Sequence, residues 1–236
     1  MQTDERARFL ADLTHSLRTP LLTAIRRSDI ALRRDQPTRQ DLLLIRALCT
    51  RMWAQISSFR AMATLTSNGQ VQPNLAALTA REIVFIVNSV VQDAQALTRS
   101  TDSHRFEIHT DADDSTLVEV DIDLFEMALR ELIDNAVKYS LVDGRIEIGV
   151  RSHGREHVDV TITNQTVPVS PDEVKRFLER GWRSPTARRL TPDGLGIGLW
   201  LVQAVMQAQK GSLSIESSGK TVSVTMELPS VRHQEA

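Results

Sequence analysis

The N-terminal third of the chain contains two long helical segments that cannot close a core by themselves. They are expected over Asp4–Arg34 and Thr38–Leu65, separated by the break Asp35-Gln36-Pro37-Thr38. Proline lacks a backbone N–H and has a fixed φ, so Pro37 suits the start of the second helix. In that helix the apolar residues alternate four and three positions apart, which is a heptad seam: Ile45, Cys49, Met52, Ile56, Phe59 and Ala63.

Each helix of such a hairpin needs apolar partners on more than one side. Dimerisation through the hairpin into a four-helix bundle satisfies this need and is the predicted arrangement. The alternative is a monomeric hairpin that docks on the rest of the chain. Cys49, the single cysteine, lies on the apolar stripe and is expected to be a small buried hydrophobic residue. One cysteine excludes an internal disulfide and suits a reducing compartment.

The polar segment Thr66–Pro73 contains both glycine and proline and predicts a linker, with domains over residues 1–67 and 74–230. Helices are expected over Thr79–Leu97, Asp121–Tyr139 and Gly196–Gln209, with a short helix after Pro171. Strands are expected over Arg105–His109, Thr116–Val120, Arg145–Arg151, His157–Thr163, Ser212–Ser217 and Thr221–Leu228. This irregular order predicts a multidomain α and α+β protein, in which the second domain is an α/β sandwich with helices over one face of a mixed sheet.

Charge and hydropathy exclude several classes of partner. The net charge of −2 gives no case for binding nucleic acid or an anionic membrane surface. The sequence has no run of about 18 apolar residues, so neither a membrane span nor a signal peptide is expected. The predicted location is cytoplasmic, with any input domain lying outside this chain.

A single histidine near the start of the first helix is the first candidate for chemistry. At about 100° per residue, Leu10, Leu13, Leu17 and Ala24 share one side of the helix. Asp12, His15, Ser16 and Thr19 share the opposite side. Taken alone, His15 is most simply a solvated surface histidine. The Arg18-Thr19-Pro20 that follows it, and two motifs far downstream, favour a functional role.

The first downstream motif lies on the helix expected over Asp121–Tyr139. Glu131, Asn135 and Lys138 are at i, i+4 and i+7, so they share a face. An amide oxygen beside a lysine can hold hydrated Mg²⁺ and balance triphosphate charge, although the same pattern also occurs on ordinary charged faces.

The second motif contains three glycines at alternate positions, directly before an apolar helix: Gly194, Gly196 and Gly198. Backbone N–H groups of such a loop can approach phosphates at a helix N-terminus. The preceding segment Ser184–Asp193 is polar and basic. It is expected to be a loop, either a mobile lid or a disordered connection.

In this order, the segments resemble the catalytic core of sensor histidine kinases of two-component systems. That core consists of a dimerisation and histidine-phosphotransfer hairpin followed by an ATP-binding domain of the GHKL (Bergerat) type. His15 matches the phospho-acceptor, and Arg183 falls where the segment before the lid supplies an arginine. The remaining nucleotide-binding positions that match are Asn135, Lys138, Tyr139, Gly194, Gly196, Gly198 and Leu199.

The resemblance implies an ATP-dependent protein histidine kinase. ATP would bind with Mg²⁺ held at Asn135, and His15 would attack the γ-phosphorus. The phosphoryl group would then pass to an aspartate of a response-regulator receiver domain, and the hairpin would form a homodimer. Thr19, four residues after the histidine, is at a position that the family ties to phosphatase activity, and Glu131 on the shared helix face is a further candidate catalytic residue.

Two departures from the family pattern affect the implied mechanism. Ser16 stands where the family usually has an acidic residue after the histidine, and a hydroxyl cannot act as a carboxylate base. Asp12, one turn earlier on the same face, is the proposed substitute. After the strand His157–Thr163, Asn164 replaces the aspartate that reads adenine, and Thr166 and Pro168 replace glycines. An asparagine amide oxygen can still accept from the adenine amino group, so ATP binding is expected to be real but weak.

Two other interpretations stay open from the sequence. A pseudokinase or phosphotransfer relay would keep the fold and His15 but make little or no use of ATP. A regulatory serine kinase or anti-sigma-type GHKL protein would not need the His15 hairpin.

Four of the other histidines are not expected to bind metal. They lie on or near strands without cysteine, aspartate or glutamate at ligand spacing: His104, His109, His153 and His157.

Overall fold

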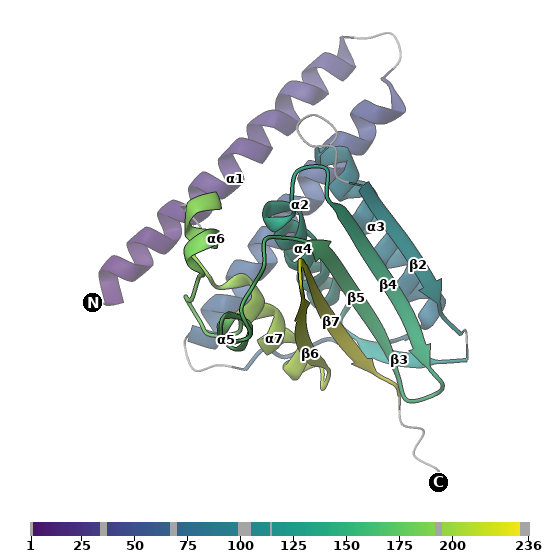
Figure 1. The fold of residues 1–236 in the computed structure, drawn as a ribbon. Coiled ribbons are helices and arrows are strands. Elements are labelled where there is room, and N and C mark those ends of the chain that lie inside the picture. Colours follow the sequence, from purple (N-terminus) through teal and green to yellow (C-terminus); the bar gives the residue numbers. More distant parts are fainter. Residues whose placement is uncertain are drawn as a thin grey trace.

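The N-terminal part of the protein is an antiparallel pair of long helices. The computed structural model describes residues 2–33, 37–66, 70–98, 105–113, 115–191 and 195–231, with only the backbone described for 2–16, 66 and 105. α1 (Gln2–Leu32) and α2 (Arg39–Thr66) run side by side (Figure 1), which confirms the predicted hairpin. Thr38 caps α2, since Asp41 N donates to Thr38 Oγ1 at 3.1 Å and Thr38 Oγ1 donates to Asp41 Oδ2 at 2.6 Å.

The second part is a mixed sheet covered on one face by helices, as the sequence predicts. Its five strands have the order β2-β4-β5-β7-β6, in which β2 and β4 are parallel and the other pairs are antiparallel. The strands are β2 (Arg105–Asp111), β4 (Arg145–His153), β5 (His157–Gln165), β6 (Ser212–Ser218) and β7 (Thr221–Pro229). The covering helices are α3 (Ala80–Thr98), α4 (Ile122–Tyr139) and α7 (Gly198–Ala208) (Figure 1).

Two elements differ from the sequence prediction. β1 (Ala76–Thr79) has no counterpart among the predicted strands; it pairs antiparallel with β3 (Leu117–Val120) in a separate two-stranded sheet. The segment expected to be a loop over Ser184–Asp193 contains a short helix, α6 (Pro185–Leu190), in addition to the expected α5 (Pro171–Arg176). α6 forms because Ser184 accepts from Ala187 N as N-cap and Pro185 occupies the first helical turn.

The main core lies between the sheet and α3 and α4. Alternate side chains of the central strands are buried there: Ile146, Ile148, Val150, Val158, Val160 and Ile162. The opposite, helix-free face carries polar cross-strand pairs, including Thr161 with Thr225 at 3.0 Å and Thr163 with Ser223 at 2.8 Å. Among the described residues, no helix is long and apolar enough to cross a membrane.

Within the single chain the hairpin docks on the second domain through α2. Ala61 and Met62 of α2 pack with Met127 of α4 and with Leu201 and Val205 of α7 in a second apolar cluster. The alternative arrangement, a hairpin that docks on the rest of its own chain, is therefore present in the structure. Dimerisation through the hairpin stays a prediction. Apolar side chains that remain exposed on the hairpin are available for that bundle: Leu21, Leu22, Ile25, Ile30, Leu42, Trp53 and Ile56.

The expected burial of Cys49 is wrong for the single chain. Cys49 is exposed, whereas its neighbours Ala47 and Leu48 are buried. The reason is that α2 turns the side next to the heptad seam, and not the seam itself, toward α3 and α4 of the sheet domain.

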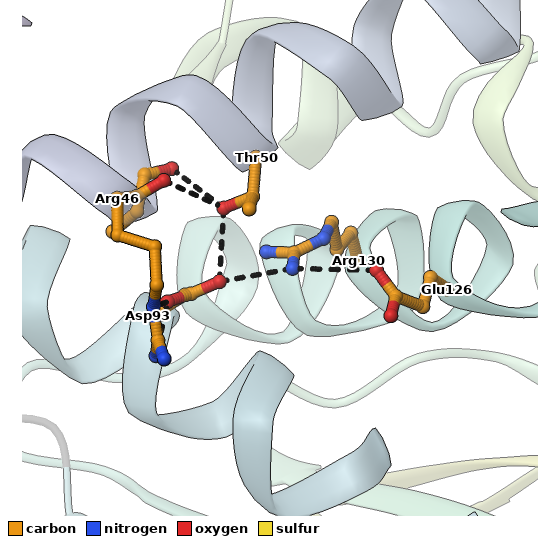
Figure 2. Close-up of polar contacts among 6 residues, drawn as sticks. Arg46, Thr50, Asp93, Glu126 and Arg130 are labelled. Atoms are coloured by element: carbon orange, nitrogen blue, oxygen red, sulfur yellow. Dashed lines mark hydrogen bonds and ion pairs between the residues drawn. The ribbon is translucent and has the colours of Figure 1, made fainter. Parts of the chain in front are cut away.

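A buried carboxylate joins the two parts. Asp93 of α3, whose side chain is 2% exposed, accepts from Arg46 of α2 at 2.7 Å and from Arg130 of α4 at 2.9 Å. Thr50 of α2 donates to the same carboxylate at 2.9 Å. Figure 2 shows these groups meeting between three helices, with Glu126 on the far side of Arg130. The charge of Asp93 is thus compensated from both the hairpin and the sheet domain.

Replacing Asp93 by alanine is expected to lower the free energy of unfolding by about 3–5 kcal/mol, because the largely buried Arg130 guanidinium loses its nearer carboxylate and keeps only Glu126 at 3.7 Å. Urea denaturation monitored by circular dichroism measures this. Asp172→Ala is the matched control, since the Asp172–Lys175 pair is almost fully exposed and contributes little. Equal losses in the two variants would contradict a stabilising role for the Asp93 network.

Candidate functional site

A cavity of about 640 Å³ lies between α4, the end of β5, the α5–α6 segment and the start of α7. This volume is in the range of small-molecule sites. Of the predicted nucleotide-site residues, those that line it are Glu131, Asn135, Lys138, Tyr139, Asn164, Arg183, Gly196, Gly198 and Leu199. The structure thus brings together residues that are distant in sequence. Gly194 lies outside the described residues.

α4 supplies one wall of the cavity because its two faces differ. Its apolar face, with Leu129, Leu132, Ile133 and Ala136, is buried in the core. The helix starts at a defined point, since Asp121 accepts from Leu124 N at 3.0 Å as N-cap. With the apolar face held against the sheet, the face that carries Glu131, Asn135 and Lys138 is directed to the cavity.

Glu131 is the most perturbed acid of the site. Although part of the residue's surface is accessible, its carboxyl group is surrounded by protein, and this burial raises its pKa. The nearby Asp134 carboxylate raises the pKa further, while Lys138 and the Ser58 hydroxyl oppose the shift. Ser58 belongs to α2 and donates to Glu131 Oε1 at 3.2 Å. The hairpin therefore contacts a residue that lines the cavity.

The wall at the end of β5 is formed by residues that stand where the family has a glycine-containing loop. Asn164 is buried and faces the cavity. Thr166 is also buried, and its N–H donates to Lys220 O at 2.7 Å. Pro168 lines the cavity. Among the described non-glycine residues, only Asp143 and Lys210 have positive φ. Thr166 therefore does not adopt the left-handed backbone that a glycine could adopt there.

Arg183 holds α6 against the cavity. Its Nη2 donates to Ala187 O at 2.7 Å and to Thr191 Oγ1 at 2.7 Å, and it also contacts Thr191 O. Tyr139 OH lies 3.2 Å from Thr191 Oγ1. The arginine thus holds the C-terminal end of α6 while it lines the site. Its predicted contact with phosphate stays a prediction.

Gly196 has a conformation and surroundings that only glycine tolerates. Its φ is +69°, and an added Cβ would lie 2.7 Å from both Arg183 Cγ and Trp182 O. Its carbonyl accepts from Gly181 N at 2.9 Å. Gly198 is also tightly placed, because a Cβ there would lie 3.0 Å from Glu131 Oε2. The glycines therefore let the chain pass close to Trp182, Arg183 and Glu131.

The start of α7 suits an anion. Its N-cap residue, Ile197, makes no side-chain capping hydrogen bond, so the first backbone N–H groups of the helix are not satisfied by a cap. Ile197, Gly198 and Leu199 all line the cavity. Such an N-terminus favours phosphate through its N–H groups and its dipole.

Chemically, the cavity combines a polar rim with an apolar floor. Leu132, Ala136, Ile162, Val222 and Val224 supply apolar surface, which suits a planar base. The Asn135 amide oxygen and the Lys138 ammonium fit a hydrated Mg²⁺ and a triphosphate. The predicted nucleotide and metal positions are therefore compatible with the residues present.

The predicted residues of the hairpin are only partly described. His15 and Asp12 lie within α1, but their side chains are outside the described residues. Thr19 is exposed on the same helix. Sequence reasoning did not find Ser58 or Thr191 as residues of the site. No sequence pattern around Ser58 indicates a role in the site, because its contact with Glu131 arises from the docking of α2.

The conformation of Gly196 predicts a strong effect of a single methyl group. Gly196→Ala should lower the free energy of unfolding by about 2–5 kcal/mol, because a left-handed backbone and a close contact both oppose the Cβ. Gly219→Ala is the control: its φ is +60°, but nothing lies within 4 Å of the added Cβ. Thermal unfolding of both variants measures the difference. If Gly196→Ala is as stable as Gly219→Ala, the close contact is not a constraint.

The raised pKa of Glu131 predicts a pH-dependent stability. A carboxyl group whose pKa is higher in the folded protein destabilises the fold as pH rises from its ordinary pKa toward the raised value. Glu131→Gln should therefore be more stable than the wild type at neutral pH, and the advantage should shrink as pH falls to the ordinary pKa of glutamic acid. Denaturant titrations across this pH range measure it.

Glu82→Gln serves as a comparison of opposite sign. Hydrogen bonds from the backbone and hydroxyl of Thr79 lower the pKa of Glu82, so this variant should be less stable than the wild type at neutral pH. A Glu131→Gln protein that loses stability in the same way would contradict the burial argument.

Comparisons with known proteins agree with this site. Residues 120–232 match the model of histidine kinase-, DNA gyrase B-, and HSP90-like ATPases. The sensor histidine kinase CusS of Escherichia coli O6:H1 is 29% identical over 228 residues, which are 95% of this chain and 45% of CusS. The sensor protein CzcS of Cupriavidus metallidurans is 28% identical over 217 residues, 91% of this chain and 44% of CzcS. The chain thus spans less than half the length of these relatives.

The fold is shared with a solved structure over most of the chain. The Acinetobacter baumannii histidine kinase AdeS has a TM-score of 0.54 and 18% identity, covering 91% of this chain and 97% of that one. At this identity, the similarity to AdeS supports the fold and nothing beyond it. By these matches, residues 120–232 are similar to ATPases of the histidine kinase-, DNA gyrase B- and HSP90-like family, and most of the chain is similar to a part of sensor histidine kinases.

Proposed function

We propose that this chain is an ATP-dependent histidine autokinase that passes its phosphoryl group to a response-regulator aspartate. The observation that carries the proposal is the convergence on one cavity of the α4 face, the end of β5, the segment at Arg183, and Gly196 and Gly198 at the start of α7. Because ATP is the substrate, we also propose a cytoplasmic location for this pair of domains. A homodimer through the exposed apolar side of the hairpin completes the proposal.

In this proposal each wall of the cavity binds a different part of the nucleotide. Asn164, buried at the end of β5, accepts from the adenine amino group, and the apolar floor contacts the ring. Lys138 and the uncapped N-terminus of α7 face the phosphates. Asn135 and Glu131 are one turn apart on α4 and would hold Mg²⁺ through its water shell; the ion would neutralise charge on the phosphates.

Phosphoryl transfer to His15 depends mainly on how the reacting groups are positioned. A neutral imidazole nitrogen of His15 attacks the γ-phosphorus; the new N–P bond forms as the bond to the ADP oxygen breaks. The displaced imidazole proton needs an acceptor, since Ser16 is not a carboxylate. We assign this role to Asp12, because Asp12 and His15 are three positions apart on α1 and share a helix face.

Labelling with γ-phosphate-labelled ATP and Mg²⁺ tests the proposal. The wild type should gain an acid-labile, base-stable label, and His15→Gln should abolish it. Asn135→Ala should gain less label because it binds the nucleotide less tightly. Its affinity for an ATP analogue should therefore fall together with its labelling. Wild-type protein that gains no label from ATP, but receives it from a phosphorylated protein partner, would identify a relay instead.

The same assay tests the assignment of Asp12. Asp12→Asn should slow labelling by about 10²–10⁴-fold, the usual contribution of a general base. Asp29→Asn, at an exposed position later on α1, is the control for a lost charge. An unchanged rate in Asp12→Asn removes this residue from the mechanism.

A further inference from the structure

A second group of chemistry-bearing side chains lies at the turn end of the β4–β5 hairpin. His153 of β4 and His157 of β5 are directly opposite each other in the antiparallel ladder. Asp159 follows His157 by two positions on β5, so its side chain is on the same face of the sheet. The expectation that these histidines lack an acidic partner is therefore wrong, because the strand pairing places Asp159 beside both of them.

This group is separate from the nucleotide cavity. It lies on the helix-free face, because the alternate residues Val158 and Val160 are buried under the helices. Asn164 lines the cavity near the other end of β5. At a rise of about 3.3 Å per residue, His157 and Asn164 are about 23 Å apart along the strand.

The distances among the three side chains are those of groups that can share one ion. His153 Nε2 lies 2.9 Å from Asp159 Oδ2, and His157 Nε2 lies 3.8 Å from Asp159 Oδ1. One ligand atom from each residue lies within 4.8 Å of the others. Two ligand atoms of a tetrahedral Zn²⁺ site are separated by about 3.3 Å, given bonds of about 2.0–2.1 Å. The two histidine–carboxylate distances lie on either side of this value.

A second observation is independent of these distances. His153 Nε2 is buried from solvent and has no hydrogen-bond partner, even though Asp159 is close. The carboxylate is therefore near the nitrogen but not aligned to accept a hydrogen bond from it. A buried ring nitrogen without a partner is costly, and a metal ion between nitrogen and carboxylate would satisfy both.

The rings need a small adjustment to coordinate one ion. The imidazoles of His153 and His157 are stacked, with centroids 4.3 Å apart and planes 18° apart, whereas their lone pairs lie in the ring planes. Both side chains are partly exposed, which leaves room for rotation about the Cβ–Cγ bonds. Glu227 of β7 is opposite Asp159 in the ladder and, with water, is the candidate for a fourth ligand.

We propose that His153, His157 and Asp159 form a binding site for a late transition-metal dication, Zn²⁺ foremost, on the helix-free face of the sheet. Two imidazoles and one carboxylate are a ligand set that Zn²⁺ accepts and that Mg²⁺, which prefers oxygen ligands, does not favour. Bound metal would link the two strands beside their turn.

Isothermal titration of tag-free, nucleotide-free protein with ZnCl₂ tests the site. The wild type should bind one Zn²⁺ at this site, and His153→Gln/His157→Gln should weaken that binding by about tenfold or more. His109→Gln is the matched control, since His109 is exposed on edge strand β2 beside Glu107 and should leave binding unchanged. MgCl₂ should give no heat at this site.

Thermal unfolding with and without ZnCl₂ gives a second readout. Zn²⁺ should raise the unfolding temperature of the wild type and of His109→Gln, but not of the double variant. The proposal is overturned if Zn²⁺ produces no binding heat, or if the double variant binds Zn²⁺ as tightly as the wild type. Neither measurement depends on kinase activity, so this result is distinguishable from failure of the proposed function.

Discussion

The arrangement of the two parts of the protein depends on the carboxylate of Asp93, which is almost entirely removed from water. A buried charge is tolerated only where other groups compensate it. Arg46 and Thr50 come from the hairpin, and Arg130 comes from α4 (Figure 2). The groups are therefore fully compensated only while α2 lies against α3 and α4. Apolar packing of Ala61 and Met62 adds contact area, but it does not by itself choose one orientation, because hydrophobic burial is not directional.

The sequence predicts the long elements well because their periodicity extends over several turns or alternations. The polar and apolar faces of α4 can be assigned from spacing alone, and the structure directs those faces to the cavity and the core. The four-residue strand β1 is too short for such a pattern, and its partner β3 is distant in sequence. α6 does carry a signal, a serine followed by proline at a helix start, which the basic composition of the segment obscures.

Contacts between the two parts of the chain are beyond prediction for a different reason. A helical wheel shows which residues of α2 share a side, but it does not show which side meets which partner. For this reason Cys49 is expected from the sequence to be buried and is exposed in the structure. For the same reason nothing in the sequence connects Ser58 with Glu131, which are joined by a hydrogen bond in the docked structure.

That hydrogen bond links the docking of the hairpin to the chemistry of the cavity. Glu131 lies one turn of α4 from the proposed Mg²⁺ position at Asn135, and burial dominates the rise in its pKa. Part of its surroundings is α2, through Ser58 and Arg51. If α2 moves away, the carboxyl group loses the Ser58 hydrogen bond and the Arg51 charge, both of which lower its pKa, and it gains contact with water, which weakens the burial that raises its pKa. Movement of the hairpin, which carries His15 on α1, is therefore coupled to the protonation of a residue in the nucleotide cavity without any change in α4 itself.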